Sequence, residues 1–172
     1  AASPKRKQRR SRKRSAQRRS AASPEKKVVK QIIDPDLMPK FSLAHVFRLT
    51  DDTGIVQHAK YGIPNLKEGY CLDDNARALI MTLMLCEQKK NPEALKLLPV
   101  YLSYIQYMQR ADGNFGNFLS FDRKYIDEIS SEDAFGRTIW ALGYLICTPP
   151  TNSYREFADE LFSLSRKHFK AL

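Results

Sequence analysis

Residues 48–78 read RLTDDTGIVQHAKYGIPNLKEGYCLDDNARA, and this stretch decides the fold. It contains four aspartates in two adjacent pairs, one histidine, two tyrosines and three glycines, and it leads directly into a long apolar segment. The run DDTG is typical of turns, because aspartate oxygens accept hydrogen bonds from neighbouring backbone N–H groups. We therefore expect a long polar loop that lines a cleft on an all-α scaffold.

Apolar residues recur at helical spacing on both sides of this loop. The spacing predicts helices over 41–49, from Asp73 or Asp74 to Lys89, over 93–110, over 131–147 and over 154–169. Pro92 suits the first turn of the third helix, and Pro99 should kink that helix or lie near its start. The residues expected to face inward include Leu43, Val46, Phe47, Leu49, Ala76, Leu79, Ile80, Leu83, Met84, Leu97, Leu98, Tyr101, Leu102, Ile105, Met108, Phe157, Leu161, Leu164 and Phe169. A short extended piece is expected within 118–129.

Two of these helices begin with related sequences. DDNARALI at 73–80 aligns with DAFGRTIW at 133–140, sixty residues later. In each copy an aspartate precedes an arginine by four residues, a spacing that places an ion pair on one helical face. Repeated two-helix units indicate a helical-hairpin array. Such arrays usually contain at least about three units, so two hairpins predict the N-terminal part of a larger domain, or an edge covered by association.

The charge of the chain is concentrated at its N-terminus. The sequence has 29 basic and 19 acidic residues, and ten of the basic ones lie within residues 1–20, which contain no acid. Strong self-repulsion and few apolar residues predict a disordered tail over 1–27, followed by a proline-containing linker over 28–40 and a helical domain over 41–172. The tail suits nuclear localisation or polyanion binding, and a solubilising arm or a linker to another domain explains its composition equally well.

Other classes of protein find little support in the sequence. Three widely spaced cysteines, Cys71, Cys86 and Cys147, form no zinc or disulfide pattern, and we expect reduced, buried thiols in a cytoplasmic protein. No apolar run is long enough to span a membrane. No P-loop, dinucleotide fingerprint or nucleophile elbow is present, so we expect no cofactor.

The paired acids at the two related helix starts are candidate catalytic residues. Helix capping requires only one acceptor, yet each start has two adjacent acids, which are Asp73 with Asp74 and Glu132 with Asp133. Carboxylates clustered at one end of parallel helices suit general acid and base chemistry on glycosidic bonds, or accept hydrogen bonds from sugar hydroxyls. Simple capping and compensation of the helix dipole remain the alternative.

Further polar and aromatic residues are candidate ligand contacts. They are Asp51, Asp52, His58, Tyr70, Arg77, Phe118, Arg123 and Arg137. Aromatic residues at 115–125 alternate with amides and charges, a composition typical of surfaces that stack on sugars, although these rings could equally anchor a loop to the core. His58 matches no metal-ligand spacing, so no metal is expected. His45 suits the edge of the core better than a ligand site.

The segments at 48–80 and at 113–143, GNFGNFLSFDRKYIDEISSEDAFGRTIWALG, resemble bacterial domains of the six-hairpin glycosidase-like, α/α-toroid class. The resemblance covers about 43–147. It implies a toroid of helical hairpins, here incomplete, with a carbohydrate cleft at the N-terminal ends of the inner helices. Domains of this class are often joined to bacterial glycosyltransferases. The resemblance also implies that the cleft residues include Asp51, Asp52, His58, Tyr70, Asp73, Asp74, Arg77, Glu132, Asp133 and Arg137.

These features lead to two functional hypotheses. The first is a carbohydrate-active helical domain, glycosidase-like or accessory to a glycosyltransferase, which binds an oligo- or polysaccharide in a carboxylate-lined cleft. The second is a non-enzymatic helical interaction module whose basic tail, residues 1–20, binds nucleic acid or another polyanion.

Overall fold

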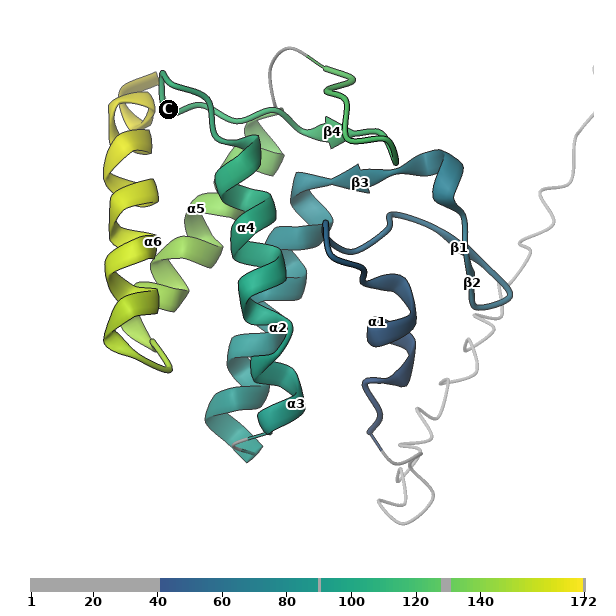
Figure 1. Ribbon diagram of the computed structural model, residues 1–172. Helices are drawn as coiled ribbons and strands as arrows, with labels where there is room; N and C mark the ends of the chain where they lie inside the picture. Colours follow the sequence, from purple (N-terminus) through teal and green to yellow (C-terminus); the bar gives the residue numbers. More distant parts are fainter. Residues whose placement is uncertain (1–40, 90, 128–130, 172) are drawn as a thin grey trace, which may run out of the picture. The chain divides into compact units, whose positions relative to one another are not determined.

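The computed structural model describes residues 41–89, 91–127 and 131–171, and in these residues the chain is mainly helical (Figure 1). The predicted tail over 1–27 and linker over 28–40 lie outside the described residues. The four long helices are α2 (Leu72–Lys89), α4 (Leu98–Met108), α5 (Glu132–Cys147) and α6 (Asn152–Ser165). The expectation of an all-α scaffold is therefore confirmed at the level of a mainly helical fold.

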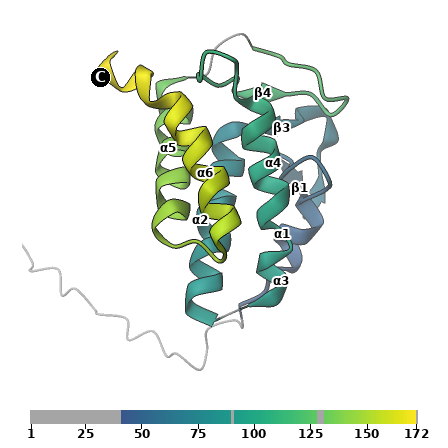
Figure 2. The same ribbon diagram turned by 60° about the vertical axis from the view of Figure 1, so that its left-hand side comes forward.

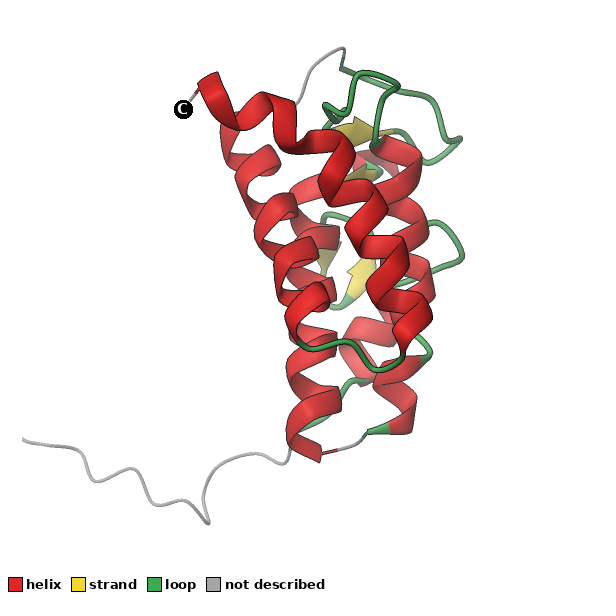
Figure 3. Cartoon of the chain, turned by 90° about the vertical axis from the view of Figure 1, so that its left-hand side faces the viewer, coloured by secondary structure: helices red, strands yellow, loops and turns green. Residues whose placement is uncertain are grey.

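The long helices form two hairpins packed in two layers. Helix α2 contacts α4, and α5 contacts α6, while α2 and α5 pack against each other between the hairpins. Figures 1 and 2 show α4 and α6 in one layer and α2 and α5 in the other, and Figure 3 views the layers from the side. Nε of Arg137 on α5 lies 3.0 Å from Oδ1 of Asp73 on α2, so the two helices begin at the same end, as the repeat predicts.

The hydrophobic core lies where the two layers meet. Its fully buried side chains include Leu79 and Leu83 from α2, Leu98 and Ile105 from α4, and Leu142 from α5. Leu79 and Leu83 are four positions apart and Leu98 and Ile105 are seven apart, so each pair lies on one face of its helix. The helical periodicity of the sequence therefore predicted these four core residues correctly.

Shorter elements connect and cover the long helices. They are α1 (Ala44–Leu49), β1 (Ala59–Lys60), β2 (Ile63–Pro64), the 3-10 helix η2 (Leu66–Glu68), β3 (Tyr70–Cys71), α3 (Pro92–Leu95), β4 (Phe118–Leu119) and the 3-10 helix η3 (Arg166–Ala171). Strands β1 and β2 pair antiparallel, with Ala59 opposite Pro64. Their connection, Tyr61-Gly62, has positive φ at both positions, as a tight two-residue hairpin turn requires.

A second antiparallel pair, β3 with β4, joins the polar loop to the segment that follows α4. Tyr70 lies opposite Leu119, and Cys71 lies opposite Phe118. Gly69 enters this pair with φ 63° and ψ −140°, a conformation that only glycine adopts readily. A Cβ at Gly69 would also overlap the carbonyl oxygen of Leu119. The close approach of the two segments therefore depends on this glycine.

Several local predictions need correction. Met84, Leu164 and Phe47 were expected to face inward, yet their side chains are 43%, 44% and 37% exposed. The helix expected over 93–110 is two helices, α3 and α4, and Pro99 lies in the first turn of α4, near the start of a helix as expected. Helix α2 begins one residue before Asp73, and α1 is shorter than expected because it begins at Ala44.

The expectation of buried cysteines is correct for Cys71 and wrong for Cys147, which is exposed. His45, expected at the edge of the core, is exposed on α1. No helix within the described residues has the length and apolar character that a membrane span requires.

Candidate functional site

The polar loop is fastened to α2 by a buried amide. Oδ1 of Asn75 accepts a hydrogen bond from the backbone N–H of Ile55 (2.9 Å), and its Nδ2 donates to the carbonyl of Cys71 (2.9 Å). Asn75 is fully buried, and a Cβ at Gly54 would come within 2.5 Å of its Oδ1. The loop can therefore approach α2 this closely only because residue 54 is glycine.

Asp51 closes the turn that the sequence predicts. Its Oδ1 accepts hydrogen bonds from the backbone N–H groups of Thr53 (2.8 Å) and Gly54 (3.2 Å). Its Oδ2 accepts a hydrogen bond from the hydroxyl of Tyr70 (2.5 Å), which is buried in β3. Burial, together with this carboxylate, raises the pKa of Tyr70 well above its ordinary value. Both carboxylate oxygens of Asp51 thus accept hydrogen bonds that hold the loop in place.

Asp52 instead points outward to a residue that is distant in the sequence. Its Oδ1 lies 2.8 Å from Nη2 of Arg123, and Nε of Arg123 donates to Oγ1 of Thr53 (3.0 Å). The guanidinium of Arg123 lowers the pKa of Asp52 below its ordinary value. Arg123 has φ 62°, a left-handed conformation, and it lies in the tight turn that brings Tyr125 back opposite Leu119. Two predicted ligand contacts, Asp52 and Arg123, therefore lie together.

A cavity of about 200 Å³ opens beside this ion pair, between the polar loop, α4 and the segment from Leu119 to Arg123. We call it the loop cavity. It is lined by Asp52, Thr53, Ser103, Tyr104, Tyr107, Leu119 and Arg123. The hydroxyl of Tyr104 is buried and makes no hydrogen bond within the described part of the chain. Burial raises the pKa of Tyr104, so this group stays protonated and able to donate.

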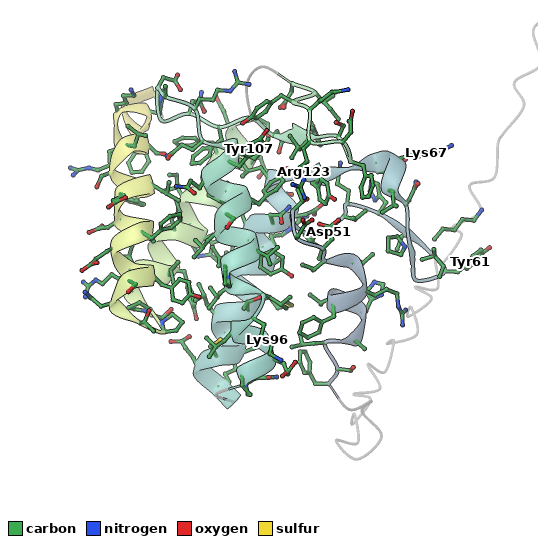
Figure 4. The ribbon with its side chains drawn as sticks, in the orientation of Figure 1. Asp51, Tyr61, Lys67, Lys96, Tyr107 and Arg123 are labelled. Atoms are coloured by element: carbon green, nitrogen blue, oxygen red, sulfur yellow. The ribbon has the colours of Figure 1, made fainter. Side chains whose placement is uncertain are left out.

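Two aromatic residues, Tyr104 and Tyr107, line the cavity, and Tyr125 is linked to it by stacking on Tyr107. The rings of Tyr107 and Tyr125 stack with centroids 5.3 Å apart and planes 5° from parallel. Phe121 stacks on Tyr70 at 6.3 Å, and Tyr107, Phe121 and Tyr125 are each about half exposed. Figure 4 shows Asp51, Tyr107 and Arg123 gathered beside α4, whereas Tyr61 projects from the β1–β2 hairpin away from them. The cavity thus combines one cation, one carboxylate and exposed aromatic faces.

Three of the four predicted catalytic acids, Asp73, Asp74 and Asp133, lie in a separate cluster at the starts of α2 and α5. Arg77 contacts both Asp73 (3.1 Å) and Asp74 on its own helix. Arg137 contacts Asp133 on its own helix (2.9 Å) and Asp73 on the neighbouring helix (3.0 Å). We call these five residues the acid–arginine network. Both ion pairs predicted from the repeat at a spacing of four residues are confirmed.

The contacts within this network limit its chemistry. Asp73, Asp74 and Asp133 each lie against at least one guanidinium, so their oxygens already accept charge-assisted hydrogen bonds within the chain. A general acid or base for glycosidic cleavage must instead lie within hydrogen-bond reach of the substrate. The network therefore suits compensation of the helix dipoles and cohesion of α2 with α5 better than proton transfer.

The remaining predicted site residues do not join either group. Glu132 is exposed in the first turn of α5, where Ser131 caps the helix by accepting from the N–H of Ala134 (3.2 Å). His58 is exposed before β1 and does not line the loop cavity. Phe118 belongs to β4, where its N–H donates to the carboxylate of Asp127 (2.9 Å). Within 41–89, 91–127 and 131–171, no three histidine, cysteine or acidic side chains gather at a possible metal site.

Sequence reasoning did not identify the contribution of α4 to the site. Thr53, Ser103, Tyr104 and Tyr107 line the loop cavity, and none of them was a predicted contact. A usable signal exists in the spacing of Tyr101, Tyr104 and Tyr107, which repeat every three residues on one helix. A tyrosine stripe that continues from the core to the exposed end of a helix indicates a polar surface at that end.

No protein-family model matches the chain, and no curated protein matches it significantly. The resemblance to six-hairpin glycosidase-like domains therefore stays a prediction.

Proposed function

We propose that the helical domain binds an uncharged saccharide in the loop cavity, and that its two hairpins are part of an α/α-toroid architecture of the six-hairpin glycosidase-like class. The observation that carries the proposal is the Asp52–Arg123 ion pair beside the stacked rings of Tyr107 and Tyr125. The carboxylate accepts from sugar hydroxyls, the guanidinium donates to them, and the rings cover the apolar face of a pyranose. Because the pair has no net charge, a neutral ligand suits it better than an anion.

The proposal concerns binding of a saccharide, and catalysis on the bound saccharide is a further step. The acids at 73, 74, 132 and 133 remain the candidates for hydrolysis of a glycosidic bond, or for support of a glycosyltransferase partner. Among them only Glu132 and Asp133 have largely exposed side chains, and Asp133 is paired with Arg137. Hydrolysis of an oligosaccharide that Glu132→Gln abolishes would support the catalytic form.

Calorimetric titration of the full chain with neutral oligosaccharides tests the binding proposal. We expect measurable binding that Arg123→Gln and Asp52→Asn each weaken by about tenfold, the effect of losing one charge-assisted hydrogen bond. The matched controls are Lys96→Gln and Glu93→Gln, which break another exposed ion pair (2.7 Å) on the side of the molecule away from the cavity (Figure 4). Absence of binding, or equal affinity in all four variants, would contradict the proposal.

A second candidate function rests on the ten basic residues among residues 1–20. Such a segment binds polyanions by releasing counterions, so the affinity falls steeply with salt. Replacing Arg9, Arg10 and Arg12 with glutamine should reduce the salt dependence of heparin binding and leave saccharide binding unchanged. A heparin affinity that does not respond to these replacements would reject this candidate.

A further inference from the structure

A second cavity, of about 270 Å³, lies between α4 and α6. We call it the interhelix cavity. Its lining is mainly apolar and comprises Pro99, Leu102, Ser103, Ser153, Tyr154 and Phe157. No charged side chain is among these residues, in contrast to the loop cavity with Asp52 and Arg123. An apolar hollow on the surface is a site where burial of a hydrocarbon group from water is favourable.

The two cavities meet at one residue. Ser103 on α4 lines both of them, with Tyr104 and Tyr107 toward the loop cavity and Pro99 and Leu102 toward the interhelix cavity. From Pro99 to Tyr107 the helix rises about 12 Å, which is the span that one ligand would need to occupy both. Ser103 is exposed, and its small side chain is the one lining residue that the two cavities share.

The volumes also favour joint occupancy. Neither cavity, at about 200 and 270 Å³, reaches the roughly 300 Å³ of an ordinary small-molecule site, whereas the two together do. The chemistry changes along the way, from an ion pair with exposed aromatic rings at one end to aliphatic and aromatic side chains at the other. One ligand that fits this sequence of surfaces has a polar head and an apolar tail.

We propose that the ligand of this site is an amphiphilic glycoside, whose sugar lies in the loop cavity and whose alkyl or acyl aglycone crosses Ser103 into the interhelix cavity. This inference rests on the proposed saccharide function, and it names the class of saccharide. Each methylene of the tail that leaves water strengthens binding by up to about fourfold. The tail therefore supplies affinity that a small, solvent-facing sugar site lacks.

Titration of the full chain with methyl β-D-glucoside and octyl β-D-glucoside, below the micellar concentration, tests the proposal. We expect the octyl compound to bind at least about tenfold more tightly. Ser153→Trp fills the interhelix cavity and should remove this gain while leaving the affinity for methyl glucoside unchanged. Ser163→Trp is the matched control, because Ser163 is also an exposed serine of α6 and lines neither cavity. The same pair of titrations with a maltoside, methyl against dodecyl, repeats the test on a longer head group.

The possible outcomes separate the two proposals. Equal affinity for the methyl and octyl glycosides overturns the amphiphile inference and leaves saccharide binding intact. An octyl gain that Ser153→Trp and Ser163→Trp affect equally also overturns it, because the tail then binds elsewhere. An octyl gain that survives Arg123→Gln without any loss of affinity indicates adsorption of the tail alone and overturns it as well. Failure of every glycoside to bind rejects both proposals.

Discussion

Two aspartate-bearing regions lie at the N-terminal end of the inner helices, and their carboxylates have different partners. In the acid–arginine network the partners come from the repeat itself, since Asp73 pairs with Arg77 and Asp133 with Arg137. In the polar loop the partners come from elsewhere in the chain, since Asp51 contacts Tyr70 and Asp52 contacts Arg123. Both regions carry adjacent acids, so acid content alone does not distinguish them.

The difference shows where a ligand site can form on a repeated scaffold. A repeated helix start brings its own arginine, so its charges are satisfied wherever the unit occurs. The unrepeated loop leaves an ion pair at the edge of a cavity, where both charges can also contact a ligand. The two copies of the repeat differ at the position of Asn75, whose side chain holds the polar loop. The corresponding residue in the second copy is Phe135, which packs on Phe115 and Phe169.

The largest expected effect comes from a substitution at Gly69, where the polar loop and β4 approach each other closely. Gly69→Ala forces a side chain into a glycine conformation and against the carbonyl of Leu119, so we expect the free energy of unfolding to fall by about 3 kcal/mol. Urea denaturation measures this change. Gly136→Ala in α5 is the control, since no atom lies within 4 Å of its added Cβ, and it should stabilise the helix by about 0.5–1 kcal/mol. Equal effects would show that the loop is not rigidly held.

A second test removes the hydrogen bond between the loop and β3. Tyr70→Phe leaves Oδ2 of Asp51 without its donor and should cost about 2 kcal/mol in urea denaturation at neutral pH. The matched control is Tyr144→Phe, which removes an exposed tyrosine–carboxylate bond to Glu87 (2.6 Å) in the helical region and should cost less than about 1 kcal/mol. A larger loss in the control would reverse the assignment of the loop as the tightly held region.

The same tyrosine gives the loop a dependence on alkaline pH. The pKa of Tyr70 is raised in the folded state by burial and by Asp51, so its contribution is complete below the ordinary tyrosine pKa of about 10. This contribution is lost as the pH rises through the higher folded value, because the unfolded chain then releases the proton first. Denaturation measured above pH 10 should therefore show a steeper loss of stability in the wild type than in Tyr70→Phe. Parallel curves would contradict this.

A third test compares the two arginines of the network. Arg137 joins α2 to α5, whereas Arg77 contacts only its own helix. Arg137→Gln should lower the free energy of unfolding by about 1 kcal/mol and Arg77→Gln by about 0.5 kcal/mol or less, because both pairs are partly exposed. Repeating the denaturation at high salt should reduce both effects by screening. A larger effect at Arg77 would mean that the ion pairs within one helix stabilise the fold more than the ion pair between α2 and α5.

The sequence predicted the parts of the molecule that depend on local periodicity. The repeat at 73–80 and 133–140 located the two inner helices, their common end and their internal ion pairs, because four-residue spacing fixes neighbours on a helix. A short extended piece was also expected within 118–129, and strand β4 lies there at Phe118–Leu119. The toroid, the substrate class and the catalytic role of the acids stay predictions.

The parts that depend on contacts distant in the sequence were not predictable from local patterns. Asp52 and Arg123 were both named as contacts, yet nothing in their spacing showed that they pair across 71 positions. The exposure of Met84 has the same origin, because periodicity does not reveal which sides of an inner helix other helices cover. The resemblance implied that His58 lies in the cleft, but His58 is exposed immediately before β1 and does not line the loop cavity.

The smallest expected change in stability concerns the ion pair of the loop cavity itself. Asp52 and Arg123 are both exposed, so Asp52→Asn should leave the free energy of unfolding almost unchanged while it weakens saccharide binding about tenfold. Arg123 lowers the pKa of Asp52, so binding in the wild type should persist at pH 4 and be lost only as the pH falls through that lower value. Calorimetric titration at pH 7, 4 and 3 measures this, and Asp52→Asn should bind with the same weak affinity at each pH. Asp52→Asn could instead destabilise the fold as much as Tyr70→Phe. The Asp52–Arg123 ion pair would then hold the loop in place, as Asp51 does, and the saccharide proposal would lose the residue on which it depends.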